Sequence, residues 1–165
     1  LKSEKLIIPG VGSFNTCMKN LKKYKLLEIL KIFGVEEKKP ILGICLGMQI
    51  MMTYGFEKKK TKGLNFIEGE CRSLDTKVKL PHVGWKKIEL NQGKNYKKKF
   101  KVYFCHSYIC KLKKAKFATS KTNYEKETFV SSFKKDNFYG FQFHPEKSRE
   151  GGLKILKNFC INNEK

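Results

Sequence analysis

Apolar residues in the first third of the chain form short unbroken runs separated by helix-like patterns. Residues 5–8 (Lys-Leu-Ile-Ile) and 40–44 (Pro-Ile-Leu-Gly-Ile) are strand-length runs, and each leads into a glycine-containing turn. Between them, residues 13–34 carry apolar side chains at helical spacing, bounded by a serine and a glycine. Residues 46–54 predict a second helix, closed by Gly55. Strand, helix, strand, helix is typical of a parallel α/β sheet.

The second half of the chain predicts strands, several of them antiparallel. Six short segments rich in aromatic and β-branched residues are separated by charged or turn-forming residues, namely 64–71, 85–90, 101–110, 115–119, 127–133 and 138–144. The polar stretch 91–99 predicts a surface loop. Residues 153–161 predict an amphipathic helix whose apolar side comprises Leu153, Leu156, Phe159 and Cys160. Without a repeat or an internal boundary, we expect residues 1–165 to form one domain.

Composition adds a globular character and a strong positive charge. Apolar residues make up 40% of the chain, and the formal net charge is +21. Arg72 and Arg149 are the only arginines among the 36 basic residues, and the lysines are spread along the whole chain. Because arginine is the usual reader of bases and phosphates, we attribute the charge to a general lysine bias and expect no nucleic-acid partner. With no membrane-length apolar run and no signal peptide, we expect a soluble cytoplasmic protein without membrane contact.

Six cysteines and three histidines raise the question of disulfides or a metal site. No CxxC pair occurs, and His82, His106 and His144 are scattered along the chain. We therefore expect neither disulfides nor a bound metal. Five of the six cysteines are interpreted as small buried apolar residues, and Cys45 is the exception.

The strongest chemical signal is Gly43-Ile44-Cys45-Leu46-Gly47, between a predicted strand and a predicted helix. It has the G-x-nucleophile-x-G form of a nucleophile elbow, with cysteine as the nucleophile. Glycine is required beside such a strained residue because side chains there would collide with neighbouring chain. The start of a helix also favours the thiolate. A buried strand-to-helix turn that happens to contain cysteine is the alternative.

A second signal is the hexapeptide Phe-Gln-Phe-His-Pro-Glu at residues 141–146. Side chains alternate along extended chain, so His144 and Glu146 are predicted to point the same way. A carboxylate beside an imidazole fixes its tautomer and stabilises the imidazolium that forms when the ring takes a thiol proton. Taken alone, a histidine that ends a strand at a surface turn is the favoured alternative, and the pairing with an upstream elbow cysteine reverses that preference.

The turn Pro9-Gly10-Val11-Gly12 is a weaker signal. A glycine-rich turn after a strand can hold phosphate, but the lysine and hydroxyl residue of a P-loop are not in place. Its backbone amides can equally form half of an oxyanion hole.

These motifs, in this order, resemble the class I (triad) glutamine amidotransferases: PGVG, then GICLGMQ, then HPEKS. LPHVGW (80–85) and YFCHSY (103–108) add a resemblance to the glutaminase subunits of imidazole glycerol phosphate synthases. The resemblance covers essentially the whole chain and implies a three-layer, flavodoxin-like open α/β sheet with a parallel core and added antiparallel strands. The family opens with a strand, a helix and a strand, so we expect that an N-terminal βαβ unit is missing here.

The resemblance implies a role for each matching position. Cys45 would attack the side-chain amide of L-glutamine, with His144 as base and Glu146 as its orienter, releasing glutamate and ammonia. The oxyanion would be bound by backbone amides drawn from Gly10, Val11, Gly12 and Leu46. Substrate binding would involve Gln49, His106, Ser107 and Tyr108, with His106 positioning its loop through hydrogen bonds. No cofactor is implied.

The resemblance also implies a partner. A synthase subunit with a (β/α)8-barrel fold would form a heterodimer with this chain and use its ammonia to make imidazole glycerol phosphate and AICAR in histidine biosynthesis. Docking would involve Pro81, His82, Trp85 and Lys147, although Trp85 has an alternative as a core residue. Two other functions stay open: ammonia supply to an enzyme that amidates sugars of surface polysaccharides, and a non-catalytic partner-binding fragment.

Overall fold

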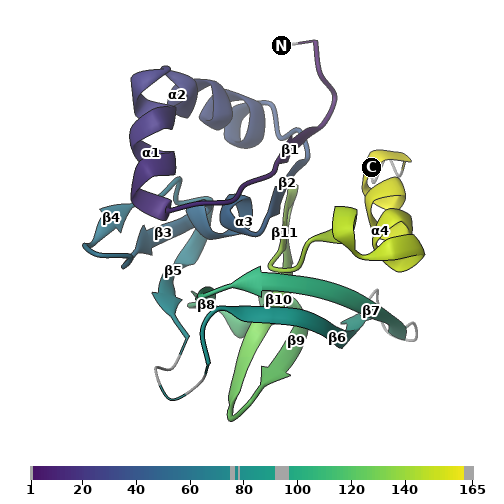
Figure 1. Ribbon diagram of the computed structural model, residues 1–165. Coiled ribbons are helices and arrows are strands. Elements are labelled where there is room, and N and C mark those ends of the chain that lie inside the picture. The colour runs from purple at the N-terminus through teal and green to yellow at the C-terminus, as the bar shows by residue number, and fades with distance from the viewer. Residues whose placement is uncertain (1, 75–76, 78, 92–96, 162–165) are drawn as a thin grey trace.

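The computed structural model describes residues 2–74, 77, 79–91 and 97–161, and its centre is a five-stranded sheet (Figure 1). The strand order is β1-β2-β11-β10-β9. These strands are β1 (Leu6–Ile8), β2 (Ile41–Ile44), β9 (Ala118–Tyr124), β10 (Glu127–Lys135) and β11 (Phe138–Phe141). Strands β1, β2 and β11 are parallel, while β10 and β9 add antiparallel pairs. The predicted parallel core with antiparallel additions is confirmed.

The remaining strands form two smaller sheets. The first has the order β4-β3-β5-β8 and contains β3 (Met52–Gly55), β4 (Thr61–Lys62), β5 (Ile67–Ser73) and β8 (Tyr108–Leu112). The second is the antiparallel pair of β6 (His82–Asn91) and β7 (Lys97–His106). The predicted strand over 101–110 is therefore two strands that belong to different sheets, and only the antiparallel partners of each strand decide where the chain changes sheet.

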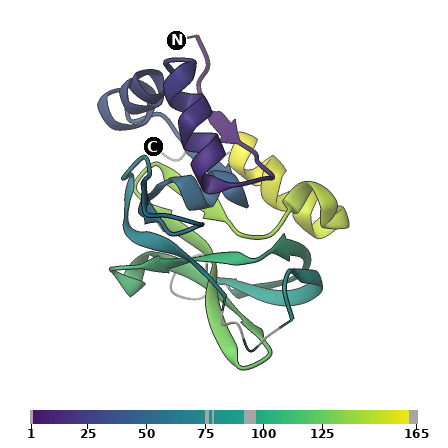
Figure 2. The ribbon, with the colours of Figure 1, turned by 60° about the vertical axis from the view of Figure 1, so that its left-hand side comes forward.

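Helices cover both faces of the parallel strands. They are α1 (Phe14–Lys23), α2 (Leu26–Lys31), the π-helical turn η1 (Ile32–Glu36), α3 (Leu46–Ile50) and α4 (Arg149–Ile161), with short turns η2 (Ala115–Phe117) and η3 (Pro145–Lys147). In Figures 1 and 2, α1 and α2 lie on one side of β1, β2 and β11, and α4 lies on the other. Strand β2 is buried throughout and contributes to two hydrophobic clusters, one on each face of the sheet. Ile41 packs in one cluster, and Leu42 and Ile44 pack in the other. This is the expected three-layer arrangement.

The predicted continuous helix over residues 13–34 is wrong. It breaks at Lys25, whose φ of 56° lies in the left-handed region, and α2 begins at the next residue. A straight helix of this length would extend about 30 Å. The break instead folds Leu30 and Phe33 back into the core that contains Phe14. Ser13 does cap α1, as predicted, because its side chain accepts from the Thr16 amide.

The predicted helix over residues 46–54 is also too long. Helix α3 ends at Ile50, and Met52–Gly55 forms β3, which pairs with β4 and β5. The competing partner comes from further along the chain, since the Met51 carbonyl accepts from the amides of Phe66 and Ile67 at 3.0 and 3.1 Å. Helical spacing in the sequence does not reveal this distant pairing.

The predicted helix over residues 153–161 and the predicted loop over residues 91–99 need smaller corrections. Helix α4 begins at Arg149, earlier than expected, and its buried side centres on Gly152 and Ile155, while Leu153 is 56% exposed. Of the predicted surface loop over residues 91–99, residue 91 ends β6 and residues 97–99 begin β7, while residues 92–96 lie outside the described residues. Over the described ranges, no helix is long and apolar enough to span a membrane.

Candidate active site

Cys45 occupies a strained turn between β2 and α3. Its φ of 51° and ψ of −106° are unusual for a residue with a side chain. A Cβ on Gly43 would lie 2.5 Å from the Gly47 carbonyl, and a Cβ on Gly47 would overlap the carbonyl oxygen of Ile8. The flanking glycines are therefore required for the reason that the sequence suggested: the neighbouring backbone leaves no room for a side chain.

Replacing Gly47 with alanine should destabilise the fold, because the new Cβ would displace the backbone of β1. We expect the free energy of unfolding to fall by about 1–3 kcal/mol, as for other overpacked sites. Gly151→Ala in α4 is the matched control, since its Cβ would meet only the Phe100 ring, at 3.1 Å. Urea unfolding of both variants measures the difference, and equal stability would contradict the tight elbow.

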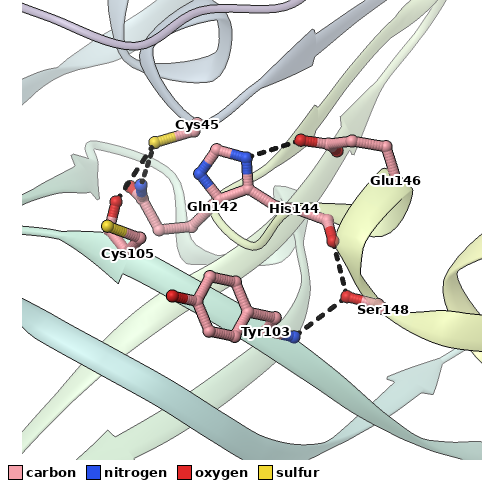
Figure 3. Close-up of polar contacts among 7 residues, drawn as sticks. All are labelled: Cys45, Tyr103, Cys105, Gln142, His144, Glu146 and Ser148. Carbon is pink, nitrogen blue, oxygen red and sulfur yellow. Dashed lines mark hydrogen bonds and ion pairs between the residues drawn. The ribbon is translucent and has the colours of Figure 1, made fainter.

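His144 and Glu146 form a close pair, as predicted, but Glu146 lies in the turn η3 and not on extended chain. His144 Nδ1 lies 2.7 Å from Glu146 Oε1. A carboxylate only accepts, so Nδ1 carries the ring proton and Nε2 of the neutral ring has a lone pair. This Nε2 is buried without a hydrogen-bond partner and, in Figure 3, faces the side on which the Cys45 sulfur lies. A buried ring nitrogen with a free lone pair is the arrangement of a general base.

The backbone of His144 is anchored to β7 by a residue that the sequence analysis did not single out. The His144 amide donates to the Tyr103 carbonyl at 2.8 Å. The buried Ser148 hydroxyl donates to the His144 carbonyl at 2.5 Å and accepts from the Tyr103 amide at 2.9 Å (Figure 3). Ser148 belongs to the HPEKS motif, which is the only sequence signal that marks it.

The Cys45 thiol lies in a buried environment, which opposes the preference for the thiolate that the start of a helix gives. Its side chain is 6% exposed as part of a buried cluster, and this burial raises the pKa of the Cys45 thiol to about 11. The Leu46 amide lowers that pKa only in part. Helix α3 has five residues, so its favourable dipole is short and desolvation outweighs it. The thiol is protonated near neutral pH and needs a base to react.

The glycine-rich turn lies beside the elbow but does not present an open oxyanion hole. The Leu46 amide, one of the expected oxyanion donors, donates to the Gly10 carbonyl at 3.4 Å. Val11 is 82% exposed, and Gly12 has a φ of 114°. The turn must therefore rotate before these amides can bind an oxyanion together.

Three of the four residues expected to bind substrate meet at one carbonyl group, that of Tyr108. The Tyr108 carbonyl accepts from Gln49 Nε2 and from His106 Nδ1, each at 3.0 Å. Gln49 and His106 are both buried, while Ser107 and Tyr108 are half-buried. Hydrogen bonding of His106 within its own loop is as predicted. The substrate contacts of the four residues stay predictions.

The residues expected at the partner surface divide into two groups. Pro81 and Lys147 are exposed, and the half-buried Trp85 lies under the Arg149 guanidinium, 5.1 Å from its ring centre. His82 differs from the expectation. It is 1% exposed, with its ring stacked against Tyr124 at a centroid distance of 4.0 Å. Its side chain points into the core and is not available to a docking partner.

Burial of the two inner histidines opposes their protonation. It lowers the pKa of His82 to about 4 and that of His106 to about 3. Neither is suited to act as a second base. Over the described residues, no three His, Cys, Asp or Glu side chains lie close enough together to hold a metal ion.

Known proteins are similar to this chain in sequence and in fold. The family described as glutamine amidotransferase class-I matches residues 3–163. Imidazole glycerol phosphate synthase subunit HisH 1 of Campylobacter jejuni (strain 81-176) is 47% identical, covering 96% of this chain and 81% of its own. Subunit HisH of Aquifex aeolicus is 39% identical, covering 99% and 80%. A crystal structure titled as a glutamine amidotransferase is similar in fold, with a TM-score of 0.73 at 15% identity, covering 94% of this chain and 77% of that one. The fold fits the expected flavodoxin-like α/β class.

Proposed function

The chain belongs to the class I glutamine amidotransferases, and from this premise we propose that it is the glutaminase subunit of an imidazole glycerol phosphate synthase. It would hydrolyse L-glutamine to glutamate and ammonia. The ammonia would pass to a (β/α)8-barrel synthase subunit that makes imidazole glycerol phosphate and AICAR in histidine biosynthesis. The observation that carries the proposal is the His144–Glu146 pair, whose unpartnered Nε2 faces the elbow of Cys45.

The chemistry follows from the protonation states at the site. His144 Nε2 takes the thiol proton, and the Cys45 sulfur attacks the amide carbon of glutamine. The tetrahedral intermediate collapses to a thioester as His144 returns the proton to the departing ammonia. Water, activated by the same nitrogen, then hydrolyses the thioester to glutamate. Glu146 stabilises the imidazolium in both steps because its carboxylate accepts a hydrogen bond from the Nδ1–H group of His144.

The closed oxyanion hole supports regulation by the partner. Since the Leu46 amide is engaged by the Gly10 carbonyl, the isolated chain lacks an oxyanion donor. One missing donor costs about a hundred- to thousandfold in rate. Gly10 and Gly12 let the turn rotate at little steric cost, so docking near the exposed Lys147 could favour the open state.

Glutamine turnover should therefore rise about a hundred- to thousandfold when the barrel subunit and its substrate are added. Ammonia release is measured for the chain alone, with the barrel subunit, and with the barrel subunit plus its substrate. Lys147→Ala should weaken the response, and Lys154→Ala, exposed on α4, is the matched control. A flat response across the three conditions would reject gating by this partner.

A further inference from the structure

A chain of buried polar contacts leads away from the Cys45 sulfur. Gln142, which is fully buried, donates through Nε2 to Cys45 Sγ at 3.8 Å (Figure 3). Its Oε1 accepts from Gln49 Nε2 at 3.3 Å. Gln49 Nε2 also donates to the Tyr108 carbonyl, which His106 shares. No motif in the sequence indicated a role for Gln142.

The choice of donor and acceptor fixes the orientation of each side-chain amide in this series of hydrogen bonds. A carbonyl only accepts, so the Gln49 amide nitrogen must face Tyr108, and its second N–H must meet an acceptor. That acceptor is Gln142 Oε1, which leaves the Gln142 NH₂ group facing the sulfur. The orientation of the Gln142 amide is therefore set by Gln49.

The two inner histidines hold the far end of the chain in place. His106 Nδ1 donates to the Tyr108 carbonyl, so Nε2 of the neutral ring accepts from His82 Nδ1 at 3.1 Å. Because both rings are buried and stay neutral near physiological pH, this order of donors does not change there.

We propose that Gln142 is a positioning residue for the nucleophile, whose amide N–H holds the Cys45 sulfur and stabilises its thiolate. The inference rests on the proposed function, since it concerns the same nucleophile. In the thiol, the S–H donates to the Cys105 carbonyl at 3.8 Å. Once His144 has taken the proton, the Cys105 carbonyl faces an anion and no longer accepts a hydrogen bond from the sulfur. The hydrogen bond from Gln142 to the sulfur then becomes charge-assisted. Gln142 itself carries no proton in the reaction, because an amide does not titrate.

The test measures how readily Cys45 loses its proton. Gln142→Met keeps a side chain of similar size but removes the donor. The rate of iodoacetamide labelling of Cys45, resolved by peptide mass spectrometry, should fall roughly ten- to hundredfold at about pH 8, as expected for the loss of a hydrogen bond to a charged group. Between about pH 7 and pH 9, the labelling rate of the variant should stay below that of the wild type at every pH, because a smaller fraction of Cys45 is thiolate. Cys105 and Cys160 are exposed, contrary to the expectation that they are buried, and their labelling provides an internal control that should not change.

A second variant separates charge from size. Gln142→Glu keeps the shape and an acceptor for Gln49, but places an anion against the sulfur, so labelling should fall further than in Gln142→Met. The other titratable groups that face or act on Cys45 are His144, Cys105 and Glu146, and Cys45 acts in turn on Cys71 and Cys110. None of these groups differs between the variants.

Three results decide the inference. Cys45 profiles that match the wild type in both variants would overturn it. For turnover, Gln142→Met should lower kcat and leave KM for glutamine nearly unchanged, since a fully buried amide does not reach the substrate. A rise in KM alone would also overturn the inference.

A further variant covers the case in which Gln142→Met does not fold. Gln49→Met releases the Gln142 amide from its orientation, so it should lower the labelling rate of Cys45 in the same way but by a smaller amount. An unchanged labelling rate would count against the proposal. Labelling needs no glutamine. A wild-type chain that shows no turnover even with the barrel subunit and its substrate would therefore reject the glutaminase and leave the labelling result interpretable.

Discussion

Replacing Cys45 with alanine is expected to abolish ammonia release, with a loss on the order of 10⁴- to 10⁶-fold, as for other covalent nucleophiles. The Cys45 sulfur lies on the side that His144 Nε2 faces, and alanine has no atom that can form the thioester. Glutamine binding should stay measurable, since the elbow is held by backbone contacts such as the Cys45 amide on the Phe141 carbonyl, 2.7 Å.

Two measurements check this prediction. Ammonia release is followed with the barrel subunit and its substrate present, so that the wild type is in its active state, and glutamine binding is followed by calorimetry. Cys160→Ala is the matched control, because Cys160 is exposed on α4. Ammonia release by Cys45→Ala at the wild-type rate would reject the assignment of the nucleophile.

The second large effect is expected at His144. His144→Ala should lower turnover by about 10⁴- to 10⁶-fold, because the protonated thiol, with its pKa raised to about 11, then has no base. Glu146→Gln should be milder, about ten- to ten-thousandfold, because it loses orientation and stabilisation of the imidazolium but keeps the base.

The order of these two effects is the informative result. Both variants are measured with the barrel subunit present, and Glu150→Gln on exposed α4 serves as the control for a lost surface carboxylate. Full activity of Glu146→Gln would reduce Glu146 to a turn residue despite its 2.7 Å contact with the ring. A milder loss for His144→Ala than for Glu146→Gln would contradict His144 as the base.

The sequence by itself determined the features that depend on neighbouring residues. Strands β1 and β2 follow from unbroken apolar runs, and the elbow follows from two glycines that flank Cys45. The His144–Glu146 contact joins residues only two apart, so it was predicted from the sequence, although the turn η3 and not alternation along extended chain brings the two side chains together. These are short-range effects of backbone geometry, and they hold wherever the segment lies in the fold.

The tertiary structure decided what depends on distant partners. Helix α3 stops at Ile50 because the following residues pair with strands far along the chain. The proton stays on Cys45 because packing removes water from the sulfur, which helix position alone did not indicate. His82 points inward because its ring packs against Phe104 and Tyr124, and Gln142 meets the sulfur because the residue that follows β11 lies against the elbow. Burial and hydrogen-bond partners are properties of the assembled core, so no local pattern in the sequence could reveal them.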